Sequence, residues 1–492
     1  MSPDPLLVAP VVVPLVAGAL LLVGARASPR AQAAASVLAT LAFAAVAAAL
    51  LAKASDGEVR TYLVGNWPAP FGIAFALDRL SALMLALLAV LALASLAHAL
   101  AHWHARGPHF HALFQFQLMG LAGAFLTADL FNLFVFFEVL LIASYGLLLH
   151  AADGARTRAA LHYVAVNLTG SALFLVAVGV LYGLTGTLNL ADLALRVARL
   201  PPEDAALARS AGGILLVVFG VKAAALPLGL WLPRTYSAAA APVAALFAIL
   251  TKVGVYAILR VHTLVFGSQA WEPGGLAASW LGPVGLATLA LGALGMLASR
   301  TVAGLAAYSV GASAGTLLAA FAYGGPTGAG ALLFYLANST LAAAMLFLLS
   351  ESAGSPRVAR AGALFLVACL ATTGLPPLAG FVAKVQLLAA VEGPARAAFW
   401  AFLLASSFAM VVACARHGSR IFWRGEAAPA TPGRAMPLLP AAFIAMAIVS
   451  LAVGAAPAQR YLAATGKQLA EPGPYIERIL GERPVARSAG LP

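Results

Sequence analysis

Long apolar runs recur from one end of the chain to the other, separated by short polar stretches. A helix of roughly 20 apolar residues is long enough to cross the hydrocarbon core of a bilayer. The runs are continuous rather than alternating between apolar and polar positions, which favours helices over the strands of a membrane β-barrel. The pattern predicts an all-α polytopic membrane protein with about fourteen transmembrane helices.

Each predicted span covers one of these runs. The spans are two centred near Val16 and Ala42, then Leu80–Ala101, Phe114–Ala128, Leu130–Leu149, Ala160–Tyr182, Gly212–Leu232, Pro242–Val261, Gly275–Ala298, Val302–Tyr323, Gly328–Leu349, Ala361–Val391, one that ends near Ala415, and Leu438–Pro457.

Proline interrupts the seventh and twelfth predicted spans. Pro227 lies in the seventh, and Pro376 and Pro377 lie in the twelfth. Proline has no N–H to donate, so the two prolines of the twelfth span free the carbonyls of Thr372 and Thr373. Broken helices at membrane depth are tolerated where they line protein or water, and two of them at matching places indicate an internal repeat around a transport path.

This pattern divides the chain into four parts. Residues 1–110 hold the first three spans, 111–265 the first repeat (spans four to eight) and 266–425 the second repeat (spans nine to thirteen). Residues 426–492 hold the last span and a polar tail. We expect the two five-helix repeats to be inverted relative to each other.

The longer polar stretches are expected at the membrane surface. The loop from Lys53 to Asp78 suits an interfacial cap, and Asp78 and Arg79 open a span at the interface. Leu188–Leu200 is amphipathic and is expected to lie on the surface.

Composition supports the membrane assignment. Hydrophobic residues make up 62% of the chain and charged residues only 9%, whereas a soluble protein has about 25% charged residues. The net charge of +12 could suggest nucleic acid binding in a soluble protein. Here basic residues in cytoplasmic loops, facing anionic lipid, account for it, so membrane lipid is the expected partner and nucleic acid is not.

The basic residues also predict an orientation in the membrane. With the N-terminus outside, the short inner loops hold more arginine than the outer loops, which hold Lys53, Arg60, Arg79, Arg260 and Arg396. The positive-inside rule then places both termini on the outer side. The inner-loop residues are Arg26, Arg30, Arg106, Arg156, Arg158, Arg234, Arg300, Arg357, Arg360, Arg416, Arg420, Arg424 and Arg434.

Four ionisable residues interrupt the apolar runs: Glu138, Lys222, Lys252 and Lys384. A charge at this depth is costly and marks a functional site by default. Burial disfavours the charged form of each group, and an opposite charge nearby restores it. Groups that titrate and influence each other in this way can relay protons. The alternative is a static ion pair between Glu138 and one lysine that only fixes helix packing.

Other reactive residue types carry weaker signals. His98, His102, His104, His109 and His111 surround one predicted loop, where a titrating interfacial loop is preferred over a metal site. Cys369 and Cys414 lie in apolar runs and are interpreted as packing residues. The chain has no phosphate-binding glycine loop, nucleophile elbow or Cys/His metal motif, so no cofactor and no soluble-type enzyme are expected.

The motifs around the buried charges resemble the D-type subunits of the multisubunit monovalent cation/proton antiporters (Mrp, Mnh or Pha type). The wider superfamily includes the N-, M- and L-type subunits of respiratory complex I. The resemblance covers about Asp78 to Leu388 and rests on Phe131-Asn-Leu-Phe-Val-Phe-Phe-Glu138, Thr185-Gly-Thr-Leu-Asn-Leu-Ala-Asp192, Phe219-Gly-Val-Lys222-Ala-Ala-Ala-Leu-Pro227, Thr251-Lys252-Val-Gly-Val-Tyr256 and Gly374-Leu-Pro-Pro-Leu-Ala-Gly-Phe-Val-Ala-Lys384.

The resemblance implies a fourteen-helix subunit whose paired site is Glu138 and Lys222. Lys252 corresponds to the lysine of the eighth helix and Lys384 to that of the broken twelfth. Protons would pass along the row from Lys222 to Lys384. Such subunits work in a hetero-oligomer that exchanges sodium or potassium for protons.

The chain departs from the superfamily pattern in the middle of this row. Many relatives carry a histidine near Asn338, a lysine near Ala343 and a glutamine at Ser313, and an aspartate where this chain has Arg234. The path between Lys252 and Lys384 would therefore depend on hydroxyls and water near Asn338, Ser339 and Thr340.

Two other functions remain open at this point. The same residues would serve a proton-pumping subunit of a complex I-like quinone oxidoreductase or a membrane hydrogenase. A non-transporting assembly scaffold, with its buried charges as packing devices, is the third hypothesis.

Overall fold

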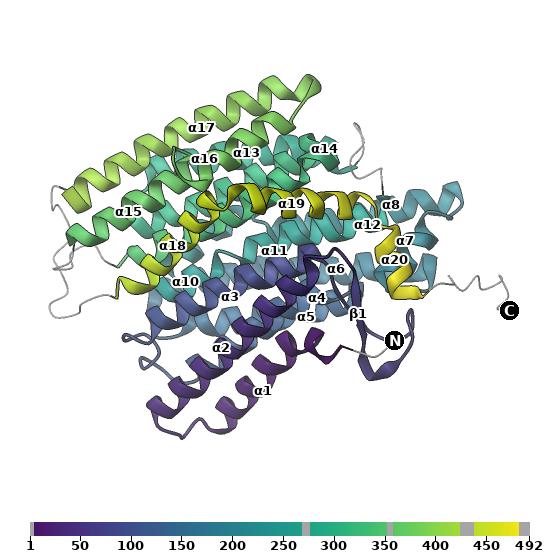
Figure 1. Cartoon of the computed structure of the whole chain (residues 1–492), viewed down its shortest axis with the longest axis horizontal. Coiled ribbons are helices and arrows are strands. Elements are labelled where there is room, and N and C mark those ends of the chain that lie inside the picture. The colour runs from purple at the N-terminus through teal and green to yellow at the C-terminus, as the bar shows by residue number, and fades with distance from the viewer. Residues whose placement is uncertain (1–3, 268–275, 352–357, 424–436, 482–492) are drawn as a thin grey trace.

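The computed structural model describes residues 4–267, 276–351, 358–423 and 437–481, and it is a bundle of helices (Figure 1). Nine helices of this part are long and apolar enough to cross a membrane, or ten if one bent pair counts as a span. Four further apolar helices have 10 to 17 residues. The prediction of an all-α polytopic membrane protein is confirmed.

Three helices and a hairpin form the N-terminal part. Helices α1 (Ala9–Val23), α2 (Pro29–Ala54) and α3 (Arg79–Ala99) match the first three predicted spans. Between α2 and α3, strands β1 (Arg60–Leu63) and β2 (Ala74–Leu77) pair antiparallel, with Arg60 opposite Leu77. The sequence predicted only a polar loop here.

The next helices run from α4 to α9. They are α4 (Phe110–Leu126), α5 (Leu130–Leu149), α6 (Gly154–Thr185), α7 (Leu190–Val197), α8 (Pro202–Lys222), the short turn η3 (Leu228–Leu230) and α9 (Trp231–Ala238). Asp129 caps α5 by accepting a hydrogen bond from Asn132 N at 2.7 Å, so the aromatic run begins as a helix there. The predicted amphipathic segment contains α7, while the residues from Pro202 onward belong to α8.

The eighth predicted span is a helix in several pieces. These are α10 (Ala241–Phe247), α11 (Leu250–Ala257), the π-helical η4 (Ile258–His262) and α12 (Thr263–Val265). The assignment of Arg260 to a short outer loop is wrong, because the helix continues past it and buries its side chain.

The second half repeats the long-helix pattern. Its helices are α13 (Leu276–Ala298), α14 (Val302–Leu349), α15 (Val358–Thr373), α16 (Ala379–Ala390), the turn η6 (Gly393–Ala395), α17 (Arg396–His417) and the π-helical η7 (Gly418–Trp423). Helix α14 covers two predicted spans and kinks at Gly325, whose φ is +58°. Tyr335 Oη donates to Thr316 Oγ1 at 3.4 Å across this kink, so the two arms of α14 fold back on each other.

The C-terminal helices turn away from the bundle direction. Helix α18 (Leu439–Val453) bends by 81° into α19 (Ala455–Ala470), and α20 (Gly473–Leu480) follows. The last predicted span therefore ends earlier than Pro457. Yellow α19 runs across the other helices (Figure 1), and Gly466 allows its close packing on Ala329 and Gly330 of α14.

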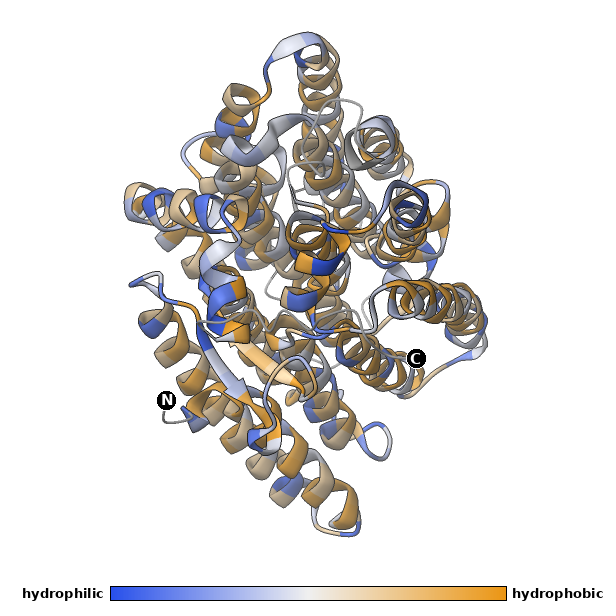
Figure 2. Ribbon diagram, turned by 90° about the vertical axis from the view of Figure 1, so that its right-hand side faces the viewer, coloured by the Kyte–Doolittle hydropathy of each residue, from blue (hydrophilic) through white to orange (hydrophobic). Residues whose placement is uncertain are grey.

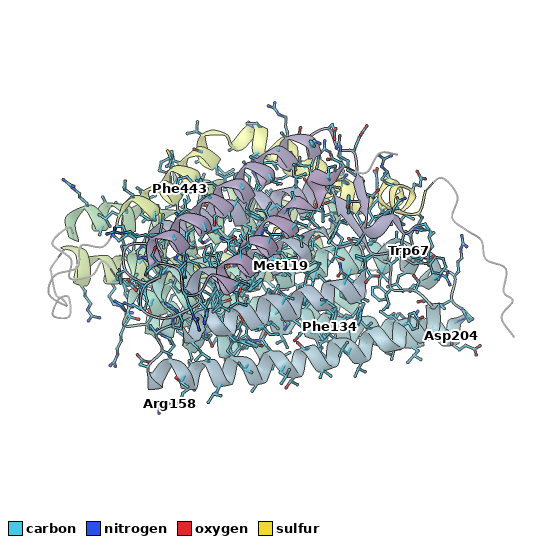
Figure 3. All side chains as sticks on the ribbon, turned by 90° about the horizontal axis from the view of Figure 1, so that it is seen from below. Trp67, Met119, Phe134, Arg158, Asp204 and Phe443 are labelled. Carbon is cyan, nitrogen blue, oxygen red and sulfur yellow. The ribbon has the colours of Figure 1, made fainter. Side chains whose placement is uncertain are left out.

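The polar loops gather at the two ends of the bundle. Arg158 lies at one end, and Trp67 and Asp204 lie at the opposite end (Figure 3). Apolar residues dominate the helices between these ends (Figure 2). We call the end with Arg158 the inner end and the other the outer end. The predicted inner-loop residues Arg357, Arg424 and Arg434 lie outside the described residues.

Candidate functional site

Glu138 and Lys222 lie on helices that both pack against α6, but they form no direct ion pair within the described part of the chain. Ser171 of α6 donates its hydroxyl to Glu138 Oε1. Asn167, one turn earlier on α6, accepts a hydrogen bond from Lys222 Nζ at 3.3 Å. The Ser171 hydroxyl also contacts the Asn167 carbonyl at 3.1 Å. The two charged groups are therefore joined through Asn167 and Ser171.

Lys222 is buried at the last position of α8, where the broken helix begins. Pro227 follows in the break, and Leu226 N donates instead to Thr288 Oγ1 of α13 at 2.9 Å. Gly229 is required here because a Cβ would lie 1.9 Å from the Ala224 carbonyl oxygen. The break is thus an ordered structure that presents Lys222 to the interior.

Lys252 is fully buried in α11. Its Nζ donates to Ser313 Oγ at 2.6 Å and to Thr251 Oγ1 at 3.2 Å. No carboxylate pairs with it among the residues that the structure describes. Ser313 is therefore the main partner of this lysine.

Lys222 and Lys252 lie on neighbouring helices because Gly254 lets α11 approach α8. A Cβ at Gly254 would lie 2.5 Å from Ala223 N and 2.9 Å from the Lys222 carbonyl carbon. Real Cβ atoms do not come so close, so a side chain would push the two helices apart.

Lys384 lies at the second break, on α16. Its Nζ donates to the Thr373 carbonyl and to Ser407 Oγ, both at 2.8 Å. The sequence predicted that Pro376 and Pro377 free the carbonyls of Thr372 and Thr373. The carbonyl of Thr373 binds the lysine, and Gly374, with φ of +80°, starts the break beside the Lys384 stem.

The three predicted polar residues between Lys252 and Lys384 differ in their contacts. Ser339 and Thr340 bond back to the carbonyl of Leu336 in their own helix. Asn338 Nδ2 donates to the Ala371 carbonyl of α15 at 3.0 Å, and its buried Oδ1 has no partner within the described residues. Asn338 therefore reaches the second break, whereas the two hydroxyls do not.

Further polar residues, which the sequence did not single out, lie between Lys252 and Lys384. Thr316 lies one turn after Ser313 on α14 and contacts Tyr335, which lies one turn before Asn338 on the other arm. Asn167, Ser171 and Ser407 were also missed. Each is a polar residue within an apolar run, which was the available signal, but serine and asparagine often bond to their own helix.

A second buried charged pair was also missed. Arg260 Nη2 lies 2.8 Å from Asp78 Oδ1 and 2.7 Å from Oδ2. Asp78 is 1% exposed, so it is buried rather than interfacial. Arg79, the other residue placed at the interface, is partly buried under α19, whose Tyr461 Oη donates to its carbonyl at 3.0 Å. Tyr475 of α20 covers the Arg260 guanidinium.

The cysteines lie beside the second break, where both line a small pocket with Thr373. Cys369 and Cys414 are buried free thiols. His104 and His111 contact each other at 3.1 Å, and burial lowers the pKa of His104. His98 is buried, and His109 is exposed. Among the described residues, no group of three or more His, Cys, Asp or Glu side chains is arranged to hold a metal.

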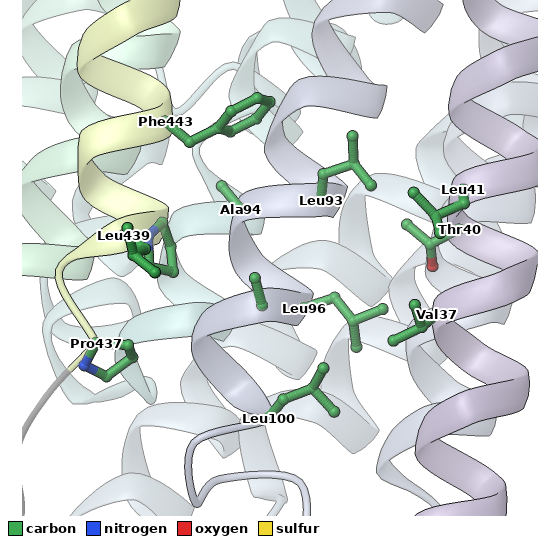
Figure 4. A pocket seen from close by; sticks show the side chains of 12 residues that line it. Val37, Thr40, Leu41, Leu93, Ala94, Leu96, Leu100, Pro437, Leu439 and Phe443 are labelled. Carbon is green, nitrogen blue, oxygen red and sulfur yellow. The ribbon is translucent and has the colours of Figure 1, made fainter.

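A groove of about 460 Å³ lies among α2, α3 and α18 (Figure 4). Leucine, valine, alanine, proline and phenylalanine line it, and Thr40 is its polar residue. The lining holds no titratable group, so the groove suits lipid chains rather than ions.

The site contains four titratable groups, each hydrogen-bonded to a hydroxyl, an amide or a freed carbonyl. Protonation of one buried group changes the electrostatic energy of its neighbours, and hydroxyls and amides can hold the water that carries a proton between them. Groups arranged in this way have the chemistry that a proton relay needs.

The chain is similar to membrane subunits of known complexes. The family model described as "NADH:quinone oxidoreductase/Mrp antiporter, TM" matches residues 127–413. A probable D-type subunit of a K(+)/H(+) antiporter from Rhizobium meliloti (strain 1021) is 42% identical over 477 residues, covering 87% of this chain and 88% of that protein. The D-type subunit of a Na(+)/H(+) antiporter from Bacillus subtilis (strain 168) is 30% identical over 444 residues, covering 86% and 89%.

A solved structure has the same fold. A chain of the Mrp complex from Dietzia sp. DQ12-45-1b superimposes with a TM-score of 0.87 and 27% identity, over 97% of this chain and 99% of that chain. The resemblance deduced from the motifs is thereby confirmed. The chain belongs to the NADH:quinone oxidoreductase/Mrp antiporter family of membrane proteins.

Proposed function

We propose that this chain is the proton-translocating subunit of a multisubunit monovalent cation/proton antiporter in the bacterial cell membrane. The observation that carries the proposal is the row of Glu138, Lys222, Lys252 and Lys384, each held inside the helical bundle by polar partners. Its similarity over most of its length to subunits named as K(+)/H(+) and Na(+)/H(+) antiporters supports the same function. The activity is transport rather than a chemical reaction.

The proposal gives each charged residue a role. Lys222 is the switch, and Glu138 adjusts its charge through Ser171 and Asn167. When the Glu138 carboxylate is protonated or its negative charge is screened, the Lys222 ammonium loses stabilisation and releases its proton more readily. Lys252 is the relay, and Lys384 is the donor or acceptor at the end of the row.

The middle of the row uses neutral groups. The sequence of contacts is Lys252 to Ser313, Thr316 to Tyr335, Asn338 to the Ala371 carbonyl, and Lys384 to the Thr373 carbonyl. Steps between these contacts need water, which the buried Asn338 Oδ1 can bind. This middle section therefore conducts without a titratable side chain of its own.

The same proposal includes fourteen spans in two inverted repeats, with both termini outside. The nine or ten long apolar helices and the four shorter ones of the described residues support a span number of this order. The two helix breaks, one after Lys222 and one before Lys384, support the proposal of two repeats.

We further propose that the chain acts in a hetero-oligomer with other antiporter subunits. A complex I-like pumping subunit is the second candidate, because the matching family includes both assemblies. Copurification separates them: small antiporter subunits support the first, and iron–sulfur subunits support the second.

The test is cation/proton exchange in everted vesicles of an antiporter-deficient strain that carries the whole set of subunits. Glu138→Gln and Lys222→Ala are expected to reduce exchange at least tenfold at unchanged membrane levels. Lys53→Ala, in the last turn of α2, is the matched lysine control and should keep the wild-type rate. Full activity of Glu138→Gln would overturn the proposal.

A further inference from the structure

The carboxylate of Glu351, just after α14, joins three other parts of the chain at the inner end. Trp103 Nε1 donates to its two oxygens at 3.0 and 3.1 Å, and Ala241 N donates to Oε1 at 3.4 Å. The Nε2 atoms of His98 and His102 lie 3.7 and 3.9 Å from Oε2. The Glu351 side chain is 21% exposed, so water reaches this carboxylate.

Glu351 is charged at neutral pH. Its burial raises the pKa, but the neighbouring His98 imidazole and the Trp103 hydrogen bond outweigh burial and lower the pKa below its usual value. An exposed carboxylate beside a buried imidazole can collect and release protons at a protein surface.

Deeper in the bundle than the Glu351 carboxylate lie buried polar atoms that have no hydrogen-bond partner in the described chain. Within the described residues, Ser95 Oγ, His98 Nδ1 and both amide atoms of Gln117 are buried and have no hydrogen-bond partner. Buried polar groups are almost always paired with protein atoms or internal water. Three such residues on the neighbouring helices α3 and α4 therefore point to a hydrated region between these helices.

These residues lie at increasing depth. His98 is next to the last residue of α3, and Ser95 is one turn deeper. Gln117 is seven residues into α4, which is about 10 Å at 1.5 Å per residue. It points away from α2, because Gln115, about 200° away around the helix, bonds to Ser36 and Thr40 of α2.

Gln117 lies at a depth similar to that of Lys252, on a helix that contacts α11. Helices α4 and α10–α11 start at the same end and are aligned further out, where Tyr256 Oη donates to the Phe125 carbonyl at 2.6 Å. Gln117 lies two turns before Phe125, and Lys252 lies one turn before Tyr256. Gln117 is therefore about 6 Å closer to the inner end than Lys252.

We propose that Glu351, His98, Ser95 and Gln117 form a water-lined port through which Lys252 exchanges protons with the solution at the inner end. A proton leaves the Lys252 ammonium, which becomes the neutral amine, and passes to water held by Gln117 and Ser95. It then binds one nitrogen of the His98 imidazole, and the other nitrogen releases a proton to Glu351 or to solvent. Gln117 and Ser95 are positioning residues in this step.

The port rests on the proposed function, because it gives protons from the lysine row a route to the inner solution. Its position is nevertheless independent of transport and can be measured without it. A port filled with water makes the side chains at Ser95 and Gln117 reachable from the inner solution, whereas a packed interior does not.

Thiol labelling measures this access directly. Ser95→Cys, Gln117→Cys and Gln115→Cys are made singly in a chain whose own cysteines are replaced (Cys369→Ala and Cys414→Ala), within the whole antiporter complex. The probe is a small cationic methanethiosulfonate added to everted or right-side-out vesicles. His109→Cys, at an exposed position of the inner loop, reports on sidedness.

The expected result is labelling of Ser95→Cys and Gln117→Cys at least tenfold faster in everted than in right-side-out vesicles, and at least tenfold faster than Gln115→Cys. Labelling of both at the Gln115→Cys rate overturns the port. Exchange by Gln117→Leu should fall at least tenfold, whereas Gln115→Leu keeps more than half of the wild-type rate.

The port and the proposed function fail in different ways. If Gln117→Leu exchanges at the wild-type rate while Lys222→Ala does not exchange, the port is wrong and the lysine row stands. If Gln117→Cys is labelled from the inner side while Lys222→Ala and Glu138→Gln retain exchange, the port stands and the lysine row is wrong.

Discussion

The two broken helices each hold a buried lysine, but by different means. At the first break, Lys222 bonds to the Asn167 amide, and the Glu138 carboxylate acts on it through Ser171. At the second break, Lys384 bonds to the Thr373 carbonyl and the Ser407 hydroxyl, and no carboxylate pairs with it in the described chain. The first lysine thus has a titratable partner, and the second has fixed dipoles.

This difference predicts which of the two lysine sites controls the other. A charge that can be neutralised gives the first site two electrostatic states, whereas permanent dipoles give the second site one. We therefore expect neighbouring subunits to change the charge of Glu138 or Lys222. The charge of Lys384 is expected to change only in response to that first site.

The largest loss of exchange and stability is expected when a side chain replaces a glycine that allows two helices to pack closely at each site. Gly254→Ala places a Cβ 2.5 Å from Ala223 N, and Gly380→Ala places one 2.1 Å from the Ala371 carbonyl oxygen. Overpacking of this kind costs about 1–3 kcal/mol of stability. Both variants should lose exchange and melt at lower temperature in detergent.

Gly220→Ala in α8 is the matched control, since its Cβ would lie 3.7 Å from the nearest Ala225 Cβ. We expect it to keep the wild-type melting temperature and exchange rate. Equal effects of Gly220→Ala and Gly254→Ala would contradict the close approach of α8 and α11.

Smaller losses of exchange, unequal in size, are expected when the hydrogen-bond partners of Lys222 and Lys384 are replaced. Asn167→Leu removes the side chain that bonds Lys222, and a hydrogen bond to a charged group contributes about 1.5–3 kcal/mol, or roughly 10- to 100-fold in rate. Ser407→Ala leaves Lys384 with the Thr373 carbonyl, so a loss of about threefold is expected. Initial exchange rates in everted vesicles measure both, and a larger loss for Ser407→Ala would reverse the comparison.

The smallest change in exchange and stability is expected at Asp56, a carboxylate outside the lysine row. The Arg60 side chain bonds Asp56 and holds its pKa at about 2. Because this folded-state value is below the unfolded one, the pair stabilises the protein above about pH 4 and loses that contribution as the pH falls to about 2. Asp56 is exposed, so Asp56→Asn should leave exchange unchanged at pH 7 and shift the melting temperature only slightly, by no more than an exposed ion pair contributes.

The sequence was sufficient to predict the all-helical membrane fold, the two proline breaks and the burial of Lys222, Lys252 and Lys384. Each is a local signal: a run of apolar residues, a proline, or a charge within such a run. The prediction that the Pro377 break frees the Thr373 carbonyl also follows from helix geometry alone, although the residue that uses this carbonyl did not.

The contacts between distant segments could not be predicted in this way. Asp78 and Arg260 are 182 positions apart, and their pairing depends on how α3 packs against the eighth-span helix. Asn167 and Ser171 connect Glu138 to Lys222 because α6 lies between α5 and α8. Helix α19 mixes polar and apolar residues, so its position depends on its packing on α14.

The most direct test of the central claim is the exchange rate of Lys252→Met, since Lys252 lies between the two breaks and is fully buried. Methionine nearly matches the lysine stem in volume and carries no proton, so the fold should be retained. The account predicts at least a hundredfold loss of proton-coupled cation exchange in everted vesicles at wild-type membrane levels. A rate above half of the wild-type value would show that protons do not pass along this row.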